Sequence, residues 1–301
     1  MITVLMSTYN GEKYLREQLD SILSQKIIDV NLLIRDDGSK DSTLNILNEY
    51  KNKYSNVMFY LGSNVGCARS FYQLVLDAPE SEYYAFADQD DVWDSNKLYE
   101  AISKINHIPK NQPSLYLSSI RPVDKELNII PYKKSNEIKP AFGIALTQAI
   151  APGCSYVFNS TLLNEFRRLG IENVDIHDWA LFRVATALNS YIYYDINPYF
   201  SYRQHENNLI GAQHSKLGHW IGRFKRFFNS DYQNVRSRMA KKLKEVYFND
   251  MTAENKKLAE VFINYDFSII NKIELIKNKK IGMVKKSDNL ILKILILIGR
   301  V

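Results

Sequence analysis

The fold is decided at the start of the chain by ITVLMSTYNGEKYLREQLDSIL, residues 2–23. Its first part, 2–6, is a run of apolar and β-branched residues typical of a buried strand. A polar stretch at 7–11 follows, and apolar residues then recur at the three- and four-residue spacing of an amphipathic helix. A strand, a short polar loop and a helix in this order form the repeating unit of an α/β protein.

The same unit recurs downstream in the first part of the chain. Further strands are expected at 30–35, 57–61 and 83–87, and helices at 12–25, 41–54 and 67–77. This alternation predicts right-handed crossovers and a mostly parallel sheet flanked by helices. Ligands of such sheets bind at the carboxyl ends of the strands, so the loops that directly follow the strands are where a site is expected.

Beyond about residue 110 the alternation loosens. Strands are expected at 114–120 and 191–196, and a helix at 178–189. From about residue 212 the pattern is mostly helical, with Lys and Arg placed within the apolar periodicity. We therefore divide the chain into an α/β domain at 1–211 and a helical C-terminal region at 212–301.

Charge separates these two parts more sharply than the net charge of +6 suggests. Residues 1–211 carry a net charge of −5, whereas residues 212–301 carry +11. The difference predicts an acidic part that holds the site and a basic C-terminal region that meets an anionic partner.

Composition places the chain among ordinary globular proteins. It has 301 residues, of which 46% are hydrophobic and 24% charged, and this excludes disordered, collagen-like and coiled-coil proteins. The two cysteines, Cys67 and Cys154, provide neither a disulfide framework nor the clustered spacing of a zinc site. The first residues lack the features of a signal peptide, so a cytoplasmic location is expected.

Polar loops follow each of the first four expected strands. They are STYNG at 7–11, RDDGS at 35–39, GSNVG at 62–66 and DQDD at 88–91. The first three also suit tight turns and helix caps. In the fourth, Asp88, Asp90 and Asp91 place three like charges within four residues, and crowded carboxylates repel one another unless a cation or a raised pKa relieves them. A magnesium or manganese ion is the expected relief, with a solvated acidic turn as the alternative.

The four motifs STYNG, DDGSxD, GSNVG and ADQDDVW, in this order, resemble the inverting family 2 glycosyltransferases with the GT-A (Rossmann-like) fold. ADQDDVW, with HDW at 177–179 and YRQHxNN at 202–208, is most similar to the bacterial rhamnosyltransferase-like branch that builds surface polysaccharides. The resemblance implies a nucleotide-sugar half at about 1–110 and an acceptor half at about 111–211. The chain has neither a Walker-type motif nor GxGxxG after the first strand, which excludes the usual P-loop and dinucleotide sites.

The resemblance also implies roles for residues of the first half. Thr8 and Tyr9 would line the nucleotide pocket, and Asp37 would accept a hydrogen bond from N3–H of uracil or thymine. Asp88 is expected on the ribose and phosphate side, and Asp90 at the divalent cation, magnesium or manganese.

An inverting transfer needs a base that takes the proton of the acceptor hydroxyl. Asp178 matches the position of the family's catalytic carboxylate, and the alternative is a first-turn charge that interacts with the helix dipole. His177 would orient that carboxylate or donate to the acceptor, with an ordinary packed residue as the alternative. Asp91 would support the metal site or cap a helix.

Two further segments of the second half are expected near the site. In 202–208, His205 would complete the metal coordination and Arg203 would hold the diphosphate, with a surface loop as the alternative. Gly153 and Cys154 match the family's acceptor-side loop. Gly153 would allow a turn or a close backbone approach, and Cys154 is expected to be a small buried filler because inversion needs no nucleophile on the enzyme.

The basic C-terminal region contains two notable segments. KLGHWIGRFKRFF at 216–228 has the pattern of a basic amphipathic helix, typical of an interfacial membrane anchor or of a helix packed on the catalytic domain. The apolar stretch at 290–298 is too short to span a bilayer and is expected to be interfacial or an oligomer contact. Without a recognisable nucleic-acid motif, nucleic acid is not an expected partner.

These features predict a metal-dependent enzyme that moves a sugar, by inversion, from a nucleoside diphosphate to a saccharide hydroxyl. The resemblance implies rhamnose from dTDP-rhamnose, for capsule, O-antigen or cell-wall synthesis, with a UDP-hexose as the alternative donor. A non-catalytic saccharide-binding or scaffold subunit of a synthase complex is the alternative of another class. The acceptor would be lipid-linked, so we expect a peripheral enzyme on the inner face of the plasma membrane.

Overall fold

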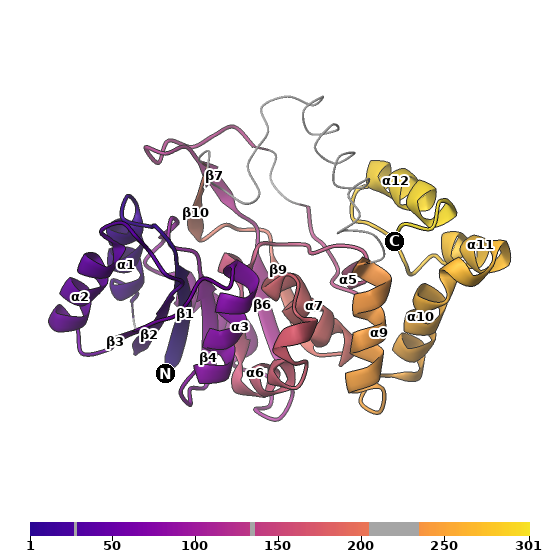
Figure 1. The fold of residues 1–301 in the computed structure, drawn as a ribbon, viewed down its shortest axis with the longest axis horizontal. Coiled ribbons are helices and arrows are strands. Elements are labelled where there is room, and N and C mark those ends of the chain that lie inside the picture. The colour runs from indigo at the N-terminus through magenta and orange to yellow at the C-terminus, as the bar shows by residue number, and fades with distance from the viewer. Residues whose placement is uncertain (27–28, 133–135, 205–234) are drawn as a thin grey trace. The chain divides into compact units, whose positions relative to one another are not determined.

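The computed structural model describes residues 1–26, 29–132, 136–204 and 235–301 and divides the chain into two compact units (Figure 1). The first unit consists of Met1–Lys139, Ala151–Ala185 and Ser190–Arg203, and the second of Pro140–Ile150, Thr186–Asn189 and Gln204–Val301. The boundary proposed from the sequence, residue 211, lies outside the described residues.

A seven-stranded sheet in the order β3-β2-β1-β4-β8-β6-β9 forms the centre of the first unit. The strands are β1 (Ile2–Thr8), β2 (Val30–Asp36), β3 (Val57–Leu61), β4 (Tyr83–Ala87), β6 (Ser114–Ser118), β8 (Val157–Asn159) and β9 (Tyr191–Asp195). All neighbours are parallel except at β8, which runs antiparallel to β4 and β6. The predicted mostly parallel sheet is confirmed.

Helices cover both faces of this sheet because β1, β2 and β4 are apolar on both sides. They are α1 (Leu15–Leu23), α2 (Thr43–Lys53), α3 (Cys67–Asp77), α4 (Lys97–Ile105), α6 (Ser160–Arg167) and α7 (His177–Ala187). Ile2, Val4 and Met6 of β1 share one core with Leu19 of α1 and Leu98 of α4. Figure 1 shows α3, α6 and α7 together on one face of the sheet.

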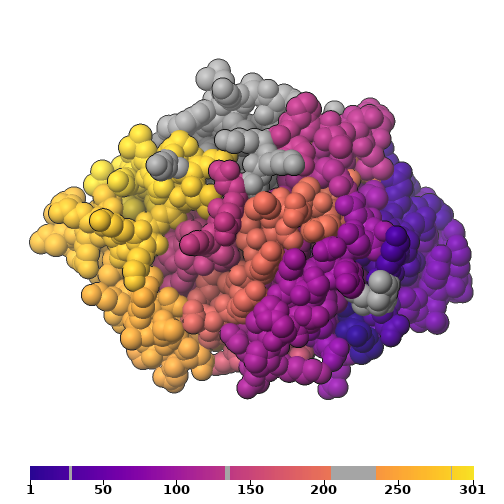
Figure 2. Space-filling view, turned by 180° about the vertical axis from the view of Figure 1, so that it is seen from behind, coloured from indigo at the N-terminus to yellow at the C-terminus, as the bar shows by residue number. Residues whose placement is uncertain are grey.

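A second, three-stranded sheet was not expected from the sequence. It contains β5 (Val92–Trp93), β7 (Arg121–Val123) and β10 (Phe200–Arg203), with β10 in the middle. Figure 2 shows the face on which the segment around 190–203 (salmon) lies against the purple and magenta segment around 100–125, consistent with the strand pairs β6–β9 and β7–β10. Tyr202 and Arg203 are therefore strand residues, and the surface-loop alternative is wrong for these two positions.

The described part of the second unit is helical, and the part of it at 235–301 lies within the segment for which the sequence predicts helices. Its elements are α5 (Phe142–Ala145), α9 (Val235–Tyr247), α10 (Ala253–Ile263), the 3-10 turn η4 (Tyr265–Phe267), α11 (Ile269–Lys277) and α12 (Lys286–Leu297). Among the described helices, none combines the length and apolar character needed to cross a membrane. The 216–228 segment lies outside the described residues.

Candidate active site

The loops after β1, β2 and β4 gather at one edge of the large sheet. Thr8 pairs with Asp36 across β1 and β2, and Met6 pairs with Ala87 across β1 and β4. Because these strands are parallel, their carboxyl ends lie side by side, and the polar residues that follow them meet at this edge.

Asp36 occupies the end of β2, with both carboxylate oxygens engaged. One oxygen accepts from the backbone N–H groups of Gly38 at 3.1 Å and Ser39 at 2.8 Å. The other accepts from the Thr8 hydroxyl at 3.0 Å. Thr8 is fully buried, so its side chain fixes the two loops to each other, and its direct contact with a nucleotide stays a prediction.

Asp37 is also buried, at 3% exposure, and is fully hydrogen-bonded. It forms an ion pair with Arg35 and accepts from the backbone N–H groups of Val65 at 3.1 Å and Gly66 at 3.0 Å. Gly66 has a φ of +83°, which side chains with a Cβ rarely adopt. Asp37 thus holds the 62–66 loop against β2, and its contact with a pyrimidine ring stays a prediction.

Tyr9 remains accessible, with 44% of its surface exposed. Its backbone is bound on both sides by the Gln89 amide, because Tyr9 N donates to Oε1 at 2.9 Å and Gln89 Nε2 donates to the Tyr9 carbonyl at 3.1 Å. Gln89 therefore ties the first loop to the acidic loop, a role that the sequence analysis missed. The exposed Tyr9 ring is available for contact with a ligand at this edge.

The acidic loop after β4 contrasts with these satisfied carboxylates. Ligand atoms of Asp88, Asp91 and Cys154 all lie within 4.8 Å of one another. Asp91 is fully buried; its Oδ1 accepts from Arg203 N at 3.2 Å, but its Oδ2 has no hydrogen-bond partner among the described residues. Burial and the charge of Asp90 raise the pKa of Asp88 to about 7, and burial with the charge of Asp88 raises the pKa of Asp91 well above its usual range.

This donor set fits a hard divalent cation. Carboxylate oxygens of Asp88 and Asp91 converge, an Asp91 oxygen has no partner among the described residues, and a bound cation would relieve the repulsion between the two carboxylates. The Cys154 thiol suits magnesium or manganese poorly, because burial raises its pKa and keeps it protonated. Asp88, Asp90 and Asp91 are thus the groups that could hold such an ion. Cys154 is buried, as predicted, and His205 lies outside the described residues.

Lys97 lies beneath the acidic loop and was missed by the sequence analysis. It is 1% exposed, its Nζ donates to the Cys154 carbonyl at 2.8 Å, and this ammonium lies 3.3 Å from the centroid of the Trp93 ring. Burial lowers the pKa of Lys97 to about 7, although the charges of Asp91 and Asp88 oppose this lowering. The signal in the sequence is a lysine on the apolar face of the 97–105 helix.

Arg203 supports the acidic loop from β10. Its Nε donates to the Asp90 carbonyl at 2.9 Å, its Nη1 donates to the Lys125 carbonyl at 2.6 Å, and its Nη2 pairs with Glu17. The guanidinium also lies over the Tyr14 ring, 4.4 Å from the centroid. These contacts favour a positioning role for Arg203, and its contact with a diphosphate stays a prediction.

Asp178 lies in the first turn of α7 and is partly exposed. Its Oδ2 accepts from Gly153 N at 2.8 Å and its Oδ1 from Trp179 N at 2.6 Å. A Cβ at position 153 would lie 2.9 Å from the Asp178 Cβ, so only glycine allows this approach. After burial and Asp90, the charge of Asp178 also contributes to the raised pKa of Asp88, which places both carboxylates at one edge.

His177 is packed behind this carboxylate. Its ring stacks on Phe71 at a centroid distance of 4.1 Å and meets Phe86 edge-on at 5.1 Å. Burial lowers its pKa, so the ring is neutral at pH 7. Nε2 has no hydrogen-bond partner among the described residues and would lie 2.8 Å from a Cβ at Gly153. This packing fixes the start of α7, and a role toward the acceptor stays a prediction.

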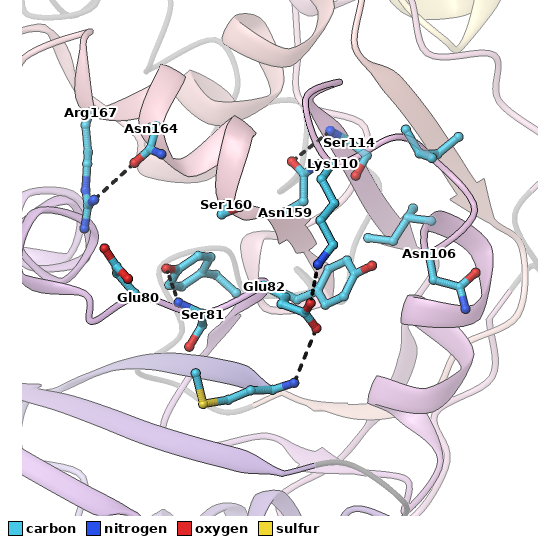
Figure 3. Close-up of a pocket in the computed structure, with 15 residues that line it drawn as sticks. Glu80, Ser81, Glu82, Asn106, Lys110, Ser114, Asn159, Ser160, Asn164 and Arg167 are labelled. Carbon is cyan, nitrogen blue, oxygen red and sulfur yellow. Dashed lines mark hydrogen bonds and ion pairs between the residues drawn. The ribbon is translucent and has the colours of Figure 1, made fainter.

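A hollow of about 530 Å³ lies at the opposite end of the strands (Figure 3). Met1, Glu82 and Tyr83 border it at the starts of β1 and β4, and Lys110 and Arg167 line it further along the chain. Lys110 Nζ lies 2.7 Å from Glu82 Oε1, so these charges neutralise each other. None of the predicted site residues lines this hollow.

Comparisons with known proteins identify the family. The model of the family described as "Glycosyl transferase family 2" matches residues 3–167. The chain is 35% identical over 218 residues to "dTDP-rhamnosyl transferase RfbG" of Shigella flexneri, covering 69% of this chain and 74% of the relative. It is 23% identical over 225 residues to "Uncharacterized glycosyltransferase RT0329" of Rickettsia typhi, covering 72% and 68%. The chain belongs to glycosyltransferase family 2 and is a glycosyltransferase.

Solved structures show the same fold. A structure of S. aureus TarS 1–349 in complex with UDP-GlcNAc superposes with a TM-score of 0.61 at 19% identity, covering 98% of this chain and 81% of the 1–349 chain. The mannosyltransferase PcManGT from Pyrobaculum calidifontis, in complex with GDP-Man and Mn2+, gives a TM-score of 0.51 at 16% identity, covering 90% and 71%. The expected GT-A-like fold is confirmed.

Proposed function

We propose that this glycosyltransferase moves rhamnose from dTDP-rhamnose to a saccharide hydroxyl, with inversion, during synthesis of a surface polysaccharide such as capsule, O-antigen or cell wall. The observation that carries the proposal is the edge of the sheet where the crowded carboxylates of 88–91 and the separate carboxylate Asp178 gather. The relative described as a dTDP-rhamnosyl transferase supports the choice of donor.

In this proposal, Asp178 is the base. Its two hydrogen bonds, to Gly153 N and Trp179 N, orient the carboxylate so that it accepts the proton of the acceptor hydroxyl. The acceptor oxygen then bonds to the anomeric carbon, and the bond from that carbon to the diphosphate oxygen breaks, with the electron pair leaving on the diphosphate. A magnesium or manganese ion held by Asp88 and Asp90 would neutralise the charge on the departing group.

The loops on the other side of the site would hold the nucleoside. Tyr9 offers an exposed ring beside Gln89, and the Asp37–Arg35 pair shapes the adjoining 62–66 loop. Thymine and uracil present the same N3–H group, so these residues do not by themselves separate a thymidine from a uridine donor.

A comparison of donor substrates tests this proposal. Purified protein would be incubated with manganese, a saccharide acceptor and either dTDP-rhamnose or a UDP-hexose, and nucleoside diphosphate release would be followed. We expect faster release from dTDP-rhamnose and a product whose anomeric configuration is opposite to that of the donor. Faster release from the UDP-hexose would contradict dTDP-rhamnose as the donor and assign the UDP-hexose instead. Nucleotide binding without turnover on any acceptor would favour the scaffold alternative.

We further propose a lipid-linked acceptor and a peripheral position on the inner face of the plasma membrane. The support is the net charge of +11 on residues 212–301, which suits an anionic surface.

A further inference from the structure

Helix α12 presents apolar side chains to solvent. Leu290, Ile294 and Leu297 are 65%, 50% and 49% exposed, and their spacing places them on one side of the helix. Leu292 and Leu295, on the other side, are buried. The helix therefore packs on its unit through one apolar face, and among the described residues a second apolar face is left uncovered.

Helix α11 and the turn before it, which lie beside α12, also carry exposed apolar side chains. Phe267, Ile269 and Ile270 are 80%, 61% and 73% exposed. Lys272 of α11 donates to the Leu297 carbonyl at the end of α12 at 3.2 Å, and Figure 1 shows the two helices side by side. We call these exposed residues the α11–α12 surface: Phe267, Ile269, Ile270, Leu290, Ile294 and Leu297.

Unpaired lysines accompany the α11–α12 surface. Lys277, Lys279, Lys285 and Lys293 are exposed, and within the described part of the chain they form no ion pair. The segment 267–301 contains eight Lys and Arg but only two Asp and Glu. The positive charge is therefore not neutralised locally.

We infer that the α11–α12 surface docks on an anionic lipid membrane. Isoleucine, leucine and phenylalanine side chains would enter the headgroup boundary while the lysines meet anionic headgroups. Helix α12, from Lys286 to Leu297, is too short to cross a bilayer and suits a position in the interface plane. In a two-fold pair of this surface with a second copy, the same lysines would repel one another, so charge favours lipid.

The inference extends the proposed function, because docking would bring the enzyme to a lipid-linked acceptor. It is independent of the 216–228 segment that the sequence pattern singled out, since it rests on other residues. Docking and catalysis can therefore be tested separately.

Vesicle sedimentation tests the inference. Full-length protein would be mixed with phosphatidylcholine vesicles, with or without phosphatidylglycerol, and the bound fraction measured. We expect the wild type to bind the anionic vesicles. Two separate triple variants, Leu290→Ser/Ile294→Ser/Leu297→Ser and Lys277→Glu/Lys279→Glu/Lys293→Glu, should each bind about tenfold more weakly. The matched control, Leu61→Ser/Ile129→Ser, removes apolar residues exposed on the first unit and should bind like the wild type.

Unchanged vesicle binding in Leu290→Ser/Ile294→Ser/Leu297→Ser would overturn the inference. So would a wild-type protein that is dimeric in lipid-free solution and becomes monomeric in this variant. Thermal unfolding of each variant identifies loss of fold, and because all substituted residues are exposed we expect unchanged melting temperatures. Donor turnover with a water-soluble acceptor, measured on the same samples, should be unaffected. Vesicle binding without any donor turnover would support the docking surface and contradict the proposed function.

Discussion

Two acidic loops at the same edge of the sheet place their carboxylates in opposite environments. After β2, Asp36 and Asp37 accept hydrogen bonds from backbone N–H groups and side chains, and Asp37 is also paired with Arg35. After β4, the carboxylates of Asp88 and Asp91 crowd together, and one Asp91 oxygen has no partner among the described residues. A carboxylate with hydrogen-bond partners stabilises the conformation of its loop. Crowded, buried carboxylates destabilise the folded protein until a cation or a proton reduces their repulsion.

Asp178 differs from both groups. Its carboxylate is oriented by two backbone N–H groups, like those after β2, but it remains partly exposed and can therefore meet a substrate. We expect Asp178→Asn to lower kcat about a thousandfold because the amide cannot take the acceptor proton. The KM for the donor should change little, as measured by steady-state kinetics. Asp175→Asn, an exposed carboxylate three residues earlier, is the control and should turn over normally. Near-normal kcat in Asp178→Asn would remove it as the base.

Gly153→Ala tests the orientation of that carboxylate without removing it. The added methyl would lie 2.9 Å from the Asp178 Cβ and 2.8 Å from His177 Nε2, so the side chains must shift. We expect kcat to fall about tenfold to a hundredfold, since a displaced catalytic group loses its alignment. Donor affinity, measured by calorimetry, should stay constant. A kcat equal to that of the wild type would show that the close approach of Gly153 is unimportant for the reaction.

The matched pair Asp37→Asn and Asp91→Asn compares the two loops through stability. Asp37→Asn leaves Arg35 buried without its counter-charge and should lower the free energy of unfolding by about 3 kcal/mol. Burial raises the pKa of Asp91 well above its usual range, so its charged form is unfavourable, and an amide at this position carries no charge. Asp91→Asn should therefore leave the metal-free protein at least as stable as the wild type. Urea unfolding of both proteins measures the difference. Equal destabilisation by the two substitutions would break the comparison.

The smallest effect is a dependence of stability on pH. Asp88 has a native pKa of about 7 against a usual value of 3.8. Between these values the native metal-free protein holds a proton that the unfolded chain has released, so this group makes the free energy of unfolding fall as pH rises. The slope of the free energy of unfolding against pH, measured for the wild type and for Asp88→Asn, isolates the contribution of this group. We expect the wild-type slope to be the more negative, and a more positive wild-type slope would contradict the prediction. Manganese, by replacing the proton, should stabilise the protein more at about pH 7 than at about pH 5.

Much of the large sheet could be predicted from the sequence. The segments 57–61, 67–77 and 83–87 were expected within the same limits that the structure gives, because each is an apolar pattern bounded by polar loops. The small sheet was missed, since its strands β5, β7 and β10 have two to four residues and show no periodicity. Their pairing depends on residues far apart in the chain.

The candidate site shows the same division between local and long-range information. Motif spacing brought Asp88, Asp90 and Asp178 forward as candidates. It could not show that Lys97 would be buried beneath the acidic loop, because a lysine is usually solvent-exposed. The resemblance placed Arg203 near the site, but it did not show that this side chain would donate to the Asp90 carbonyl from a strand more than a hundred residues away.

Calorimetric titration with thymidine diphosphate, in manganese and then in chelator, tests the central claim that the crowded loop binds a metal with the nucleotide. We predict measurable binding in manganese, weakened at least about tenfold by the chelator or by Asp90→Asn, since a bound ion would neutralise negative charge on both the carboxylates and the diphosphate. Uridine diphosphate under the same conditions ranks the two bases. Equal affinity in manganese and in chelator would contradict the account.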